Sequence, residues 1–340
     1  MSLLKYIFRR LLALLPVLFG TITLTFILSR LMPGDPVVAY LGESHGFTAE
    51  QYAAALRQLG LDRPIIEQYF IYLQNLFTGN WGVSVSYARG APVWDLVMSR
   101  FTRTFDLALF AIIIAALVGI KTGVISSTHR NKAKDTIYRG FALVGVSIPV
   151  FWLGMMLQYF LGYRLDIFPA VGFKSAGIGD PTVITNFRII DCILTGRIDL
   201  LFDYLYHLFL PIMCLSFITL ASITRQTRSS MLEVLEQDYV RTARAKGCKE
   251  KDVINAHARR NALIPTVTVI GLNFGGLLAG AVLTETTFNL HAIGELLVSA
   301  IQNTDYWVLN AIVFMTTITF IIINLITDLI YGLIDPRIRY

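Results

Sequence analysis

Basic side chains are concentrated in one segment of the chain, residues 225–262. Nine Lys and Arg residues lie between Arg225 and Arg260, in a sequence that is otherwise mostly apolar. A cationic surface of this kind binds anionic lipid headgroups or a surface of another protein. The chemistry indicated is therefore binding, rather than the making or breaking of bonds.

The sequence patterns of common catalytic sites are absent from the chain. It contains no GxxxxGK(S/T) phosphate loop, no HExxH and no GxSxG, so it cannot hydrolyse ATP by itself, and a membrane enzyme is the least favoured interpretation. Cys192, Cys214 and Cys248 are far apart and form no CxxC pair, which predicts neither a metal site nor a disulfide. His207, alone in an apolar block, predicts a hydrogen bond between two helices.

Apolar residues occur in blocks that are long enough to cross a membrane. The chain is 55% hydrophobic and 15% charged, with a mean hydropathy of +0.60, whereas soluble domains contain about 25% charged residues. A helix needs about 20 apolar residues to span a bilayer, and six blocks of this kind predict an all-α integral membrane protein with six transmembrane helices. The blocks are Leu11–Ser29, Leu107–Ser127, Gly140–Tyr163, Tyr204–Thr224, Asn261–Thr284 and Tyr306–Thr327.

The distribution of Lys and Arg predicts the orientation of these helices. With both termini in the cytoplasm, 18 Lys and Arg residues fall in cytoplasmic segments and 9 in outer segments, as the positive-inside rule requires. This topology accounts for the formal net charge of +6 without nucleic acid as a partner. The first block is too long for a signal peptide and has no small-residue cleavage site, so we expect it to remain as an anchor.

The same topology divides the chain into three parts. Residues 1–31 form a cytoplasmic stub and the first transmembrane helix, residues 32–104 form an extracytoplasmic segment, and residues 105–340 form a five-helix core that includes the basic segment. In the outer segment, Thr48 and Gln51 have the spacing of a capping box at the start of a helix.

Glycine and proline predict two features of the transmembrane helices. Gly271 and Gly275 have GxxxG spacing, which indicates close contact with another helix. Prolines inside apolar blocks remove a backbone donor and predict kinks. These prolines are Pro16, Pro149 and Pro211.

The basic segment has the pattern of two helices joined by a tight turn. Apolar residues recur at helical spacing up to Lys246, and Gly247 fits the left-handed position after a helix end. Glu250 and Asp252 suit the positive end of a second helix. An amphipathic helix lying on anionic lipid is the alternative, but the glycine and the acidic helix start favour a projection that fits a socket on another protein.

This segment resembles the EAA loop of ATP-binding cassette importer permeases. The sequence DYVRTARAKG, from Asp238 to Gly247, is similar to the form found in the dipeptide/oligopeptide/nickel branch of that family. It has Arg241-Thr242-Ala243 in place of Glu-Ala-Ala and Arg259-Arg260 in place of Leu-Pro. Both departures are usual in the B-type subunit of the branch.

Further motifs of the B-type subunit occur in the right order along nearly the whole chain. The resemblance therefore implies the fold of a type I importer permease. The motifs are Phe8-Arg9-Arg10-Leu11, Pro33-Gly34-Asp35-Pro36, Leu59-Gly60-Leu61-Asp62-Arg63-Pro64, Gly82-Val83-Ser84, Thr284-Glu285-Thr286-Thr287-Phe288, Asp305-Tyr306 and Asp335-Pro336-Arg337-Ile338-Arg339.

The resemblance also implies a set of partners. They are a second, C-type permease, two ATPase subunits that hydrolyse ATP with Mg, an extracytoplasmic solute-binding protein and the membrane lipid, while this chain itself binds no cofactor. The basic segment is expected to carry the motion of the ATPases into the membrane. The residues expected to do so are Arg241, Ala243, Arg244, Lys246, Gly247, Cys248, Lys249 and Glu250.

The cargo is less well defined than the architecture. The branch favours di- and oligopeptides and leaves oligosaccharides and nickel chelates open. A secondary transporter or channel is disfavoured, because the apolar blocks hold almost no Asp, Glu, Lys or Arg at their centres. The outer segment 32–104, with Glu285 and Glu295, is expected to dock the solute-binding protein. Neutral polar residues expected along the translocation path are Gln158, Asn273, Asn310 and Asn324.

Overall fold

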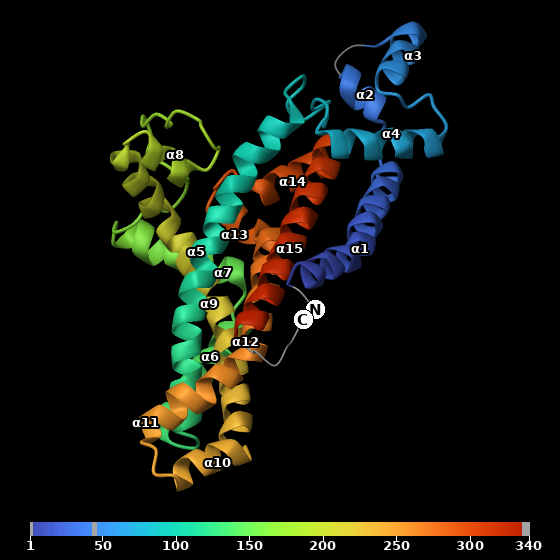
Figure 1. Ribbon diagram of the computed structural model, residues 1–340. Helices are drawn as coiled ribbons and strands as arrows, with labels where there is room; N and C mark the ends of the chain where they lie inside the picture. The colour runs from blue at the N-terminus through green and yellow to red at the C-terminus, as the bar shows by residue number, and fades with distance from the viewer. Residues whose placement is uncertain (1–2, 43–45, 335–340) are drawn as a thin grey trace.

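The computed structural model describes residues 3–42 and 46–334, and almost all of this chain is helical (Figure 1). The elements of the first half are α1 (Leu3–Leu31), α2 (Pro36–Leu41), α3 (Ala49–Gln58), α4 (Ile65–Thr78), α5 (Val93–Thr128), α6 (Ala133–Ser147), α7 (Val150–Leu157), the π-helix η1 (Gln158–Arg164) and α8 (Arg188–Leu194). Those of the second half are α9 (Ile198–Leu235), α10 (Asp238–Ala245), α11 (Glu250–Asp252), the π-helix η2 (Val253–Ala258), α12 (Arg259–Gly280), α13 (Val282–Thr287), α14 (Ile293–Gln302) and α15 (Tyr306–Ile334).

Five helical runs in the described chain are long and apolar enough to cross a membrane. They are the larger part of α1, α5, α9, the run from Glu250 to Leu278 that includes α12, and the larger part of α15. A sixth candidate consists of α6 followed by α7 and η1, but its two halves are bent by 101°. The prediction of six membrane-crossing elements in an all-α protein is therefore confirmed, with one element broken rather than continuous.

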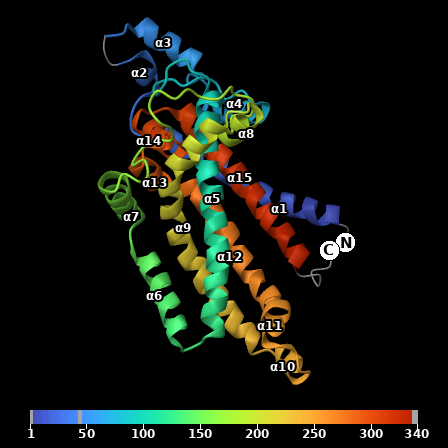
Figure 2. The same ribbon diagram turned by 90° about the vertical axis from the view of Figure 1, so that its left-hand side faces the viewer.

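Pro149 explains the broken element. A proline has no backbone N–H, and its ring disfavours helical geometry at the preceding residue. Ile148 accordingly has extended geometry, with φ −83° and ψ 127°, and α7 begins immediately after Pro149. Figure 2 shows α6 and α7 as two arms set at an angle to each other. Pro16 and Pro211, by contrast, lie inside continuous helices.

The packing of α5 against α9 forms the centre of the bundle. It depends on glycines in α5, because a Cβ atom at Gly123 would lie 2.6 Å from the Cβ atom of Thr227. A Cβ atom at Gly119 would lie 2.8 Å from a methyl carbon of Ile223. Larger residues at these two positions would force the helices apart.

The predicted close contact of Gly271 and Gly275 with another helix is confirmed. The space that a side chain on Gly271 would need is filled by Thr327 of α15, and the space beside Gly275 is filled by the ring of Phe320. The two glycines therefore let α12 approach α15 closely.

Helices α1 and α15 lie side by side and run in opposite directions. Near the start of α1, Arg10 forms an ion pair with Asp328 of α15, with 3.3 Å between Nε and Oδ2. The start of α1 and the end of α15 therefore lie on the same side of the bundle, the cytoplasmic side. The motif at residues 335–339 lies outside the described residues.

The outer segment begins with local capping contacts, one of which the sequence predicts. Asp35 caps α2 by accepting a hydrogen bond from the backbone N–H of Val37, and it also accepts one from the hydroxyl of Tyr52, both at 2.8 Å. The predicted capping box is present at α3, where the N–H of Gln51 donates to Thr48 Oγ1 and the N–H of Thr48 donates to Gln51 Oε1. These contacts fix the start of each short helix and link α2 to α3.

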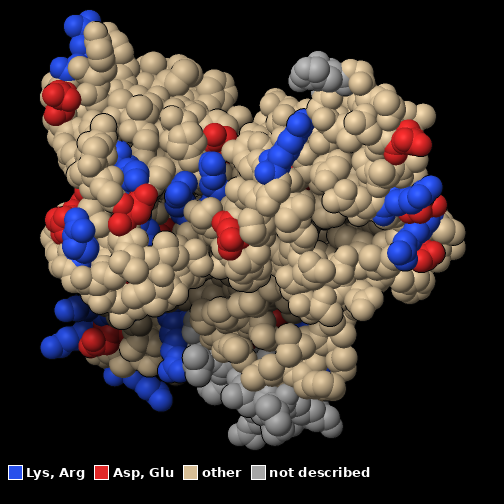
Figure 3. Space-filling model, turned by 90° about the horizontal axis from the view of Figure 1, so that it is seen from above, with Lys and Arg blue, Asp and Glu red and all other residues tan. Residues whose placement is uncertain are grey.

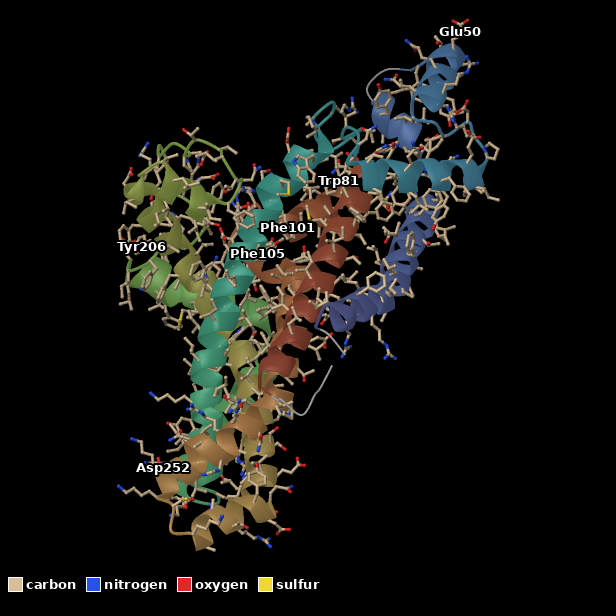
Figure 4. All side chains as sticks on the ribbon, in the orientation of Figure 1. Glu50, Trp81, Phe101, Phe105, Tyr206 and Asp252 are labelled. Atoms are coloured by element: carbon tan, nitrogen blue, oxygen red, sulfur yellow. The ribbon has the colours of Figure 1, made fainter. Side chains whose placement is uncertain are left out.

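An apolar cluster joins the outer segment to the bundle. Trp81, at the junction of α4 with α15 (Figure 4), packs in one cluster with Val93 and Val97 of α5 and Val308 and Ile312 of α15. The ring of Trp81 meets that of Phe314 edge to face, at 5.8 Å between centroids. The outer segment is therefore anchored on α15 and α5 by buried side chains.

Asp305 forms the polar part of the same junction. Its side chain is completely buried, and Oδ2 accepts hydrogen bonds from Ser84 Oγ at 2.6 Å and from the backbone N–H groups of Val85, Ser86 and Tyr87 at 3.1 to 3.2 Å. Consecutive backbone N–H groups of this kind form a concave anion site. The motifs at residues 82–84 and 305–306, far apart in the sequence, therefore meet at one carboxylate.

Two expectations about single polar residues do not hold. His207 Nδ1 contacts the backbone oxygen of Asp203 at 2.8 Å, within its own helix rather than across to another. Glu285 is completely buried, where it accepts hydrogen bonds from Thr104 Oγ1 and from the N–H of Gly294 at 2.6 and 2.7 Å. Glu285 holds α13 to α5 and α14, so it is not available to dock a solute-binding protein.

Candidate functional site

Helices α10 and α11 form a projection at the end of the molecule opposite the outer segment (Figures 1 and 2). We call residues 238–252 the knob; it consists of α10, the turn at residues 246–249, and α11. Asp252, at the end of α11, marks its position in Figure 4. The predicted helix, turn and second helix are confirmed, except that α9 and α10 are two helices separated at residues 236 and 237.

A small apolar core fastens the knob to the bundle. Val240, Ala243 and Val253 are buried against each other and contact Val234 and Leu235 at the end of α9. A second cluster continues into the bundle from the same two residues of α9; its buried members are Met231, Ala258 and Ala262. Because apolar contacts run without a gap from α10 to α9 and α12, the knob and these two helices should move together.

The turn of the knob has the geometry of a Schellman motif. Gly247 has a left-handed φ of +79°, its N–H donates to the backbone oxygen of Arg244 at 2.9 Å, and the N–H of Cys248 donates to that of Ala243 at 3.2 Å. This pairing satisfies the last carbonyls of α10 and needs a residue that tolerates positive φ. The predicted position of Gly247 after the helix end is therefore confirmed.

Arg244 and Glu250 close the knob across this turn. Arg244 Nη2 and Nε donate to the two carboxylate oxygens of Glu250 at 2.8 and 3.2 Å. This interaction raises the pKa of the Arg244 guanidinium. Both side chains remain accessible, with 41% of Arg244 and 57% of Glu250 exposed. The pair can therefore set the shape of the turn and still contact a partner.

The accessible position of this pair leads to a first prediction. Exposed ion pairs stabilise proteins by about 0–1 kcal/mol, so Arg244→Ala should lower the free energy of unfolding by no more than that amount. Thermal unfolding of the purified variant checks this result, with Glu250→Ala as the matched variant. A fall several times larger in both variants would mean that the pair holds the knob together, and that the apolar core does not.

The other residues expected to contact an ATPase separate into two groups. Ala243 is buried in the apolar core, so it packs the knob against the bundle and is not available to contact a partner. The rest are exposed at the tip or along α10, and are Arg241, Lys246, Gly247, Cys248 and Lys249. The described contacts leave this tip basic and accessible.

A buried ion pair lies between the knob and the membrane-spanning part of the bundle. Asp135 of α6 is completely buried, and Arg228 of α9 donates to both of its oxygens, from Nε at 2.7 Å and from Nη2 at 2.9 Å. Ser126 of α5 donates to the same carboxylate at 2.6 Å. The contact thus joins α5, α6 and α9.

The sequence alone did not reveal this contact. Arg228 belongs to the basic segment, and its charge suggested an exposed residue. The available signal was Asp135, an acidic residue in a short cytoplasmic stretch that otherwise carries Arg130, Lys132, Lys134 and Arg139. A single carboxylate in such a stretch is a candidate partner for an arginine on a neighbouring helix.

The four residues expected along the translocation path do not lie together. Asn273 of α12 donates to Ser222 Oγ of α9 at 3.1 Å and lines a hollow of about 510 Å³ with Arg225. Gln158 donates to the backbone oxygens of Ala170 and Thr287, which fixes the loop after η1. Asn310 lines a different cavity at the outer end, and Asn324 is half-buried in the cytoplasmic half of α15.

A second hollow, of about 570 Å³, lies beside the first. Its walls come from α5, α6 and α9, and it shares Arg225 and Val146 with the hollow at Asn273. Together the two form a continuous concave face on the cytoplasmic half of α6, α9 and α12.

Two family models together match nearly the whole chain. The model described as "Binding-protein-dependent transport system inner membrane component" matches residues 111–340. The model described as "Binding-prot-dependent transport system membrane comp, N-term" matches residues 3–108. The knob, the hollows and the Asp135–Arg228 pair all lie within the first match.

Relatives of known role are similar over the full length. The dipeptide transport system permease protein DppB of Escherichia coli (strain K12) is 42% identical over 339 residues, which cover 99% of each chain. The di/tripeptide transport system permease protein DppB of Pseudomonas aeruginosa (strain UCBPP-PA14) is 43% identical over 338 residues, again 99% of each chain. The glutathione transport system permease protein GsiC of E. coli (strain K12) is 35% identical over 337 residues and 99% of each chain.

A solved structure supports the fold. A chain of the MetNI methionine ABC transporter, in an inward facing conformation, superposes with a TM-score of 0.53 at 14% identity. The match covers 72% of this chain and 98% of that chain. The chain belongs to the family of binding-protein-dependent transport system inner membrane components, and is a multi-pass permease subunit of the inner membrane.

Proposed function

We propose that the chain is one of two permease subunits of an ATP-driven importer of di- and oligopeptides. The full-length similarity to permeases of dipeptide, di/tripeptide and glutathione transport systems supports peptides as the cargo. Uptake of a labelled dipeptide by cells that produce the complete transporter tests the cargo. Uptake of oligosaccharide or chelated nickel, with none of dipeptide, would reject it.

The proposed assembly has a second permease beside this chain in the membrane. Two ATPase subunits, which use ATP and Mg, bind on the cytoplasmic side, and a solute-binding protein docks on the outer segment. Seen from the outer end, the surface is mostly uncharged, with basic and acidic side chains interspersed (Figure 3). A solute-binding protein would therefore dock there through complementary shape and mixed polar contacts, rather than through electrostatic attraction to a surface of one charge sign.

The knob is the proposed point at which ATP hydrolysis acts on this chain. One observation carries this proposal: the exposed tip of the knob is joined by buried apolar contacts to α9 and α12. A force on the tip is therefore delivered to two membrane-spanning helices. The exposed cations Arg241, Lys246 and Lys249 would set the register of the knob in an acidic groove on the ATPase.

The proposed path for the cargo is the concave face formed by α6, α9 and α12. It is lined by polar side chains, among them Asn273, Ser222 and Thr224, and by the exposed cation Arg225. These groups suit the polar backbone of a peptide, since amides exchange hydrogen bonds with carbonyl and N–H groups. The second permease would close this face into a channel.

Substitutions of Gly247 test the coupling role. A residue with a Cβ atom in left-handed geometry costs about 1–2 kcal/mol, and proline cannot adopt a φ of +79° or donate the N–H bond to Arg244. Gly247→Val and Gly247→Pro should therefore lower peptide uptake and ATPase stimulation by roughly tenfold or more. Both are measured on the reconstituted transporter with all subunits present.

A matched control separates coupling from backbone strain. Gly177 lies in the outer cap, which we define as residues 165–197 between η1 and α9. It has the same φ of +79° and open space where a Cβ atom would be, so Gly177→Val introduces the same strain far from the knob. Gly247→Asn, which tolerates left-handed geometry, should retain most of the uptake. Normal uptake and stimulation by a fully assembled Gly247→Pro transporter would show that the knob does not couple.

A further inference from the structure

A cavity at the outer end of the molecule lies apart from the knob and from the proposed path. It has a volume of about 180 Å³ and lies where the end of α1, the middle of α4 and the start of α15 meet, next to the Trp81 labelled in Figure 4. Its polar lining comes from Arg30, Gln68, Asn75, Asn80 and Asn310, and its apolar lining is mostly aromatic.

Three of the side chains that line this cavity have buried polar atoms without a hydrogen-bond partner in the described structure. These atoms are Arg30 Nε, Gln68 Oε1 and Asn310 Oδ1. Leaving such a group unpaired costs about 1–3 kcal/mol. One orphaned group has many explanations, but three around one cavity point to a missing binding partner.

Arg30 supplies the positive charge of the cavity. Its guanidinium lies over two aromatic rings, 4.9 Å from the centroid of Phe26 and 5.5 Å from that of Tyr306. None of the ion pairs formed by the described residues includes Arg30. A guanidinium held between rings is pre-organised to bind a carboxylate or phosphate through its planar edge.

The side-chain amide oxygens of Gln68 and Asn310 favour the opposite kind of group, a hydrogen-bond donor or cation. The amide nitrogen of Gln68 donates to the backbone oxygens of Leu61 and Arg63, so the orientation of this amide is fixed and its oxygen is the group left without a partner. The oxygen of Asn310 on α15 is also buried without a partner. Free amide oxygens accept hydrogen bonds from an ammonium group or an N–H.

We propose that this cavity binds a small zwitterion, with its anionic group on Arg30 and its ammonium group directed to Gln68 and Asn310. A volume of about 180 Å³ equals that of roughly six water molecules in the liquid, which suits a free amino acid, a dipeptide or the headgroup of phosphatidylethanolamine. All three ligands share an anionic oxygen group close to an ammonium. A bound zwitterion would connect α1, α4 and α15, and so stabilise the outer segment on the bundle.

Thermal unfolding of the full-length chain in detergent tests the soluble ligands. Alanine or alanyl-alanine at millimolar concentration should raise the unfolding midpoint in a saturable manner. Reconstitution in lipid discs with and without phosphatidylethanolamine, at constant anionic lipid, tests the headgroup. A shift with the soluble ligands identifies a solute site, and a shift only with the ethanolamine lipid identifies a lipid site.

Two variants make this test specific to the cavity. Arg30→Gln removes the charge and should abolish the shift. Asn310→Leu replaces an unpaired polar group by an apolar one of similar size, so the ligand-free protein should be as stable as before or more so, while the shift should be reduced. Arg63→Gln, at an exposed arginine of the same outer segment, and Asn273→Leu, at the proposed path, should retain the full shift.

The proposal is overturned if neither the soluble zwitterions nor the ethanolamine lipid shift the midpoint, or if the shift persists in Arg30→Gln. Loss of the shift in Asn273→Leu, with retention in Arg30→Gln, would place binding on the path instead. Arg30→Gln alters the cavity and Asn273→Leu alters the proposed path, so the two variants separate this proposal from the peptide import proposed above.

Discussion

Asp305→Ala is expected to detach the outer segment from α15. The substitution removes the acceptor for the buried Ser84 Oγ and the buried N–H of Val85, and for the partly buried N–H groups of Ser86 and Tyr87. Unsatisfied buried donors cost about 1–3 kcal/mol each, and the apolar contacts around Trp81 cannot replace a hydrogen bond. We therefore expect a loss of about 3–6 kcal/mol in the stability of the junction, one of the largest effects of any single substitution in this chain.

Limited trypsin digestion measures this local loss directly. Arg89 lies on the exposed side of the loop that Asp305 holds, so cleavage after Arg89 should become much faster in Asp305→Ala. The matched control is Asp62→Ala, which removes an exposed carboxylate from the same outer segment and should leave the cleavage rate unchanged. Equal rates in the wild type and Asp305→Ala would show that the apolar cluster holds the loop alone.

Asp135→Ala should have an effect of similar size at the cytoplasmic side. It leaves the Arg228 guanidinium, which is only 21% exposed, without its anionic partner. Removing one member of a buried ion pair costs about 3–5 kcal/mol. Because the pair joins α6 to α9, the substitution should loosen α6, which forms one wall of the proposed path. We expect both a lower unfolding midpoint and lower uptake of peptide.

A double variant distinguishes the loss of the pair from the burial of an unpaired charge. Asp135→Ala combined with Arg228→Met removes both charges, and should regain part of the stability lost in Asp135→Ala alone. Lys134→Ala, at an exposed position next to Asp135, is the control for a change of charge on α6. A double variant that is less stable than the single one would show that Arg228 stabilises the bundle through other contacts.

Features that depend on a few neighbouring residues could be predicted from the sequence. The capping box at Thr48 depends on residues three positions apart, and the turn at Gly247 depends on a residue that tolerates positive φ at a helix end. The apolar blocks were equally clear, since membrane-crossing helices need a fixed length. In each case the signal and the structure are within one helix or turn.

Features that depend on distant residues could not be predicted in this way. Asp305 meets residues 84–87 across more than 200 positions, and Asp135 meets Arg228 across 93. Nothing in the local sequence of Arg228 distinguishes it from Arg241, yet one is turned into a buried pair and the other is exposed. The bend at Pro149 was underestimated because a proline within an apolar block can either kink a helix or end it.

The length of α9 has a consequence for how displacement is transmitted. This single helix of 38 residues connects the outer cap near α8 with the core of the knob. Pro211 leaves one backbone carbonyl of the helix without its usual donor, and divides α9 into arms of about 20 Å and about 36 Å. If α9 tilts about this point as a lever, a displacement at the cytoplasmic end reaches the outer cap in the opposite direction and at little more than half its size. The outer and cytoplasmic ends of the proposed path would then move in opposite directions, so that one end narrows while the other widens.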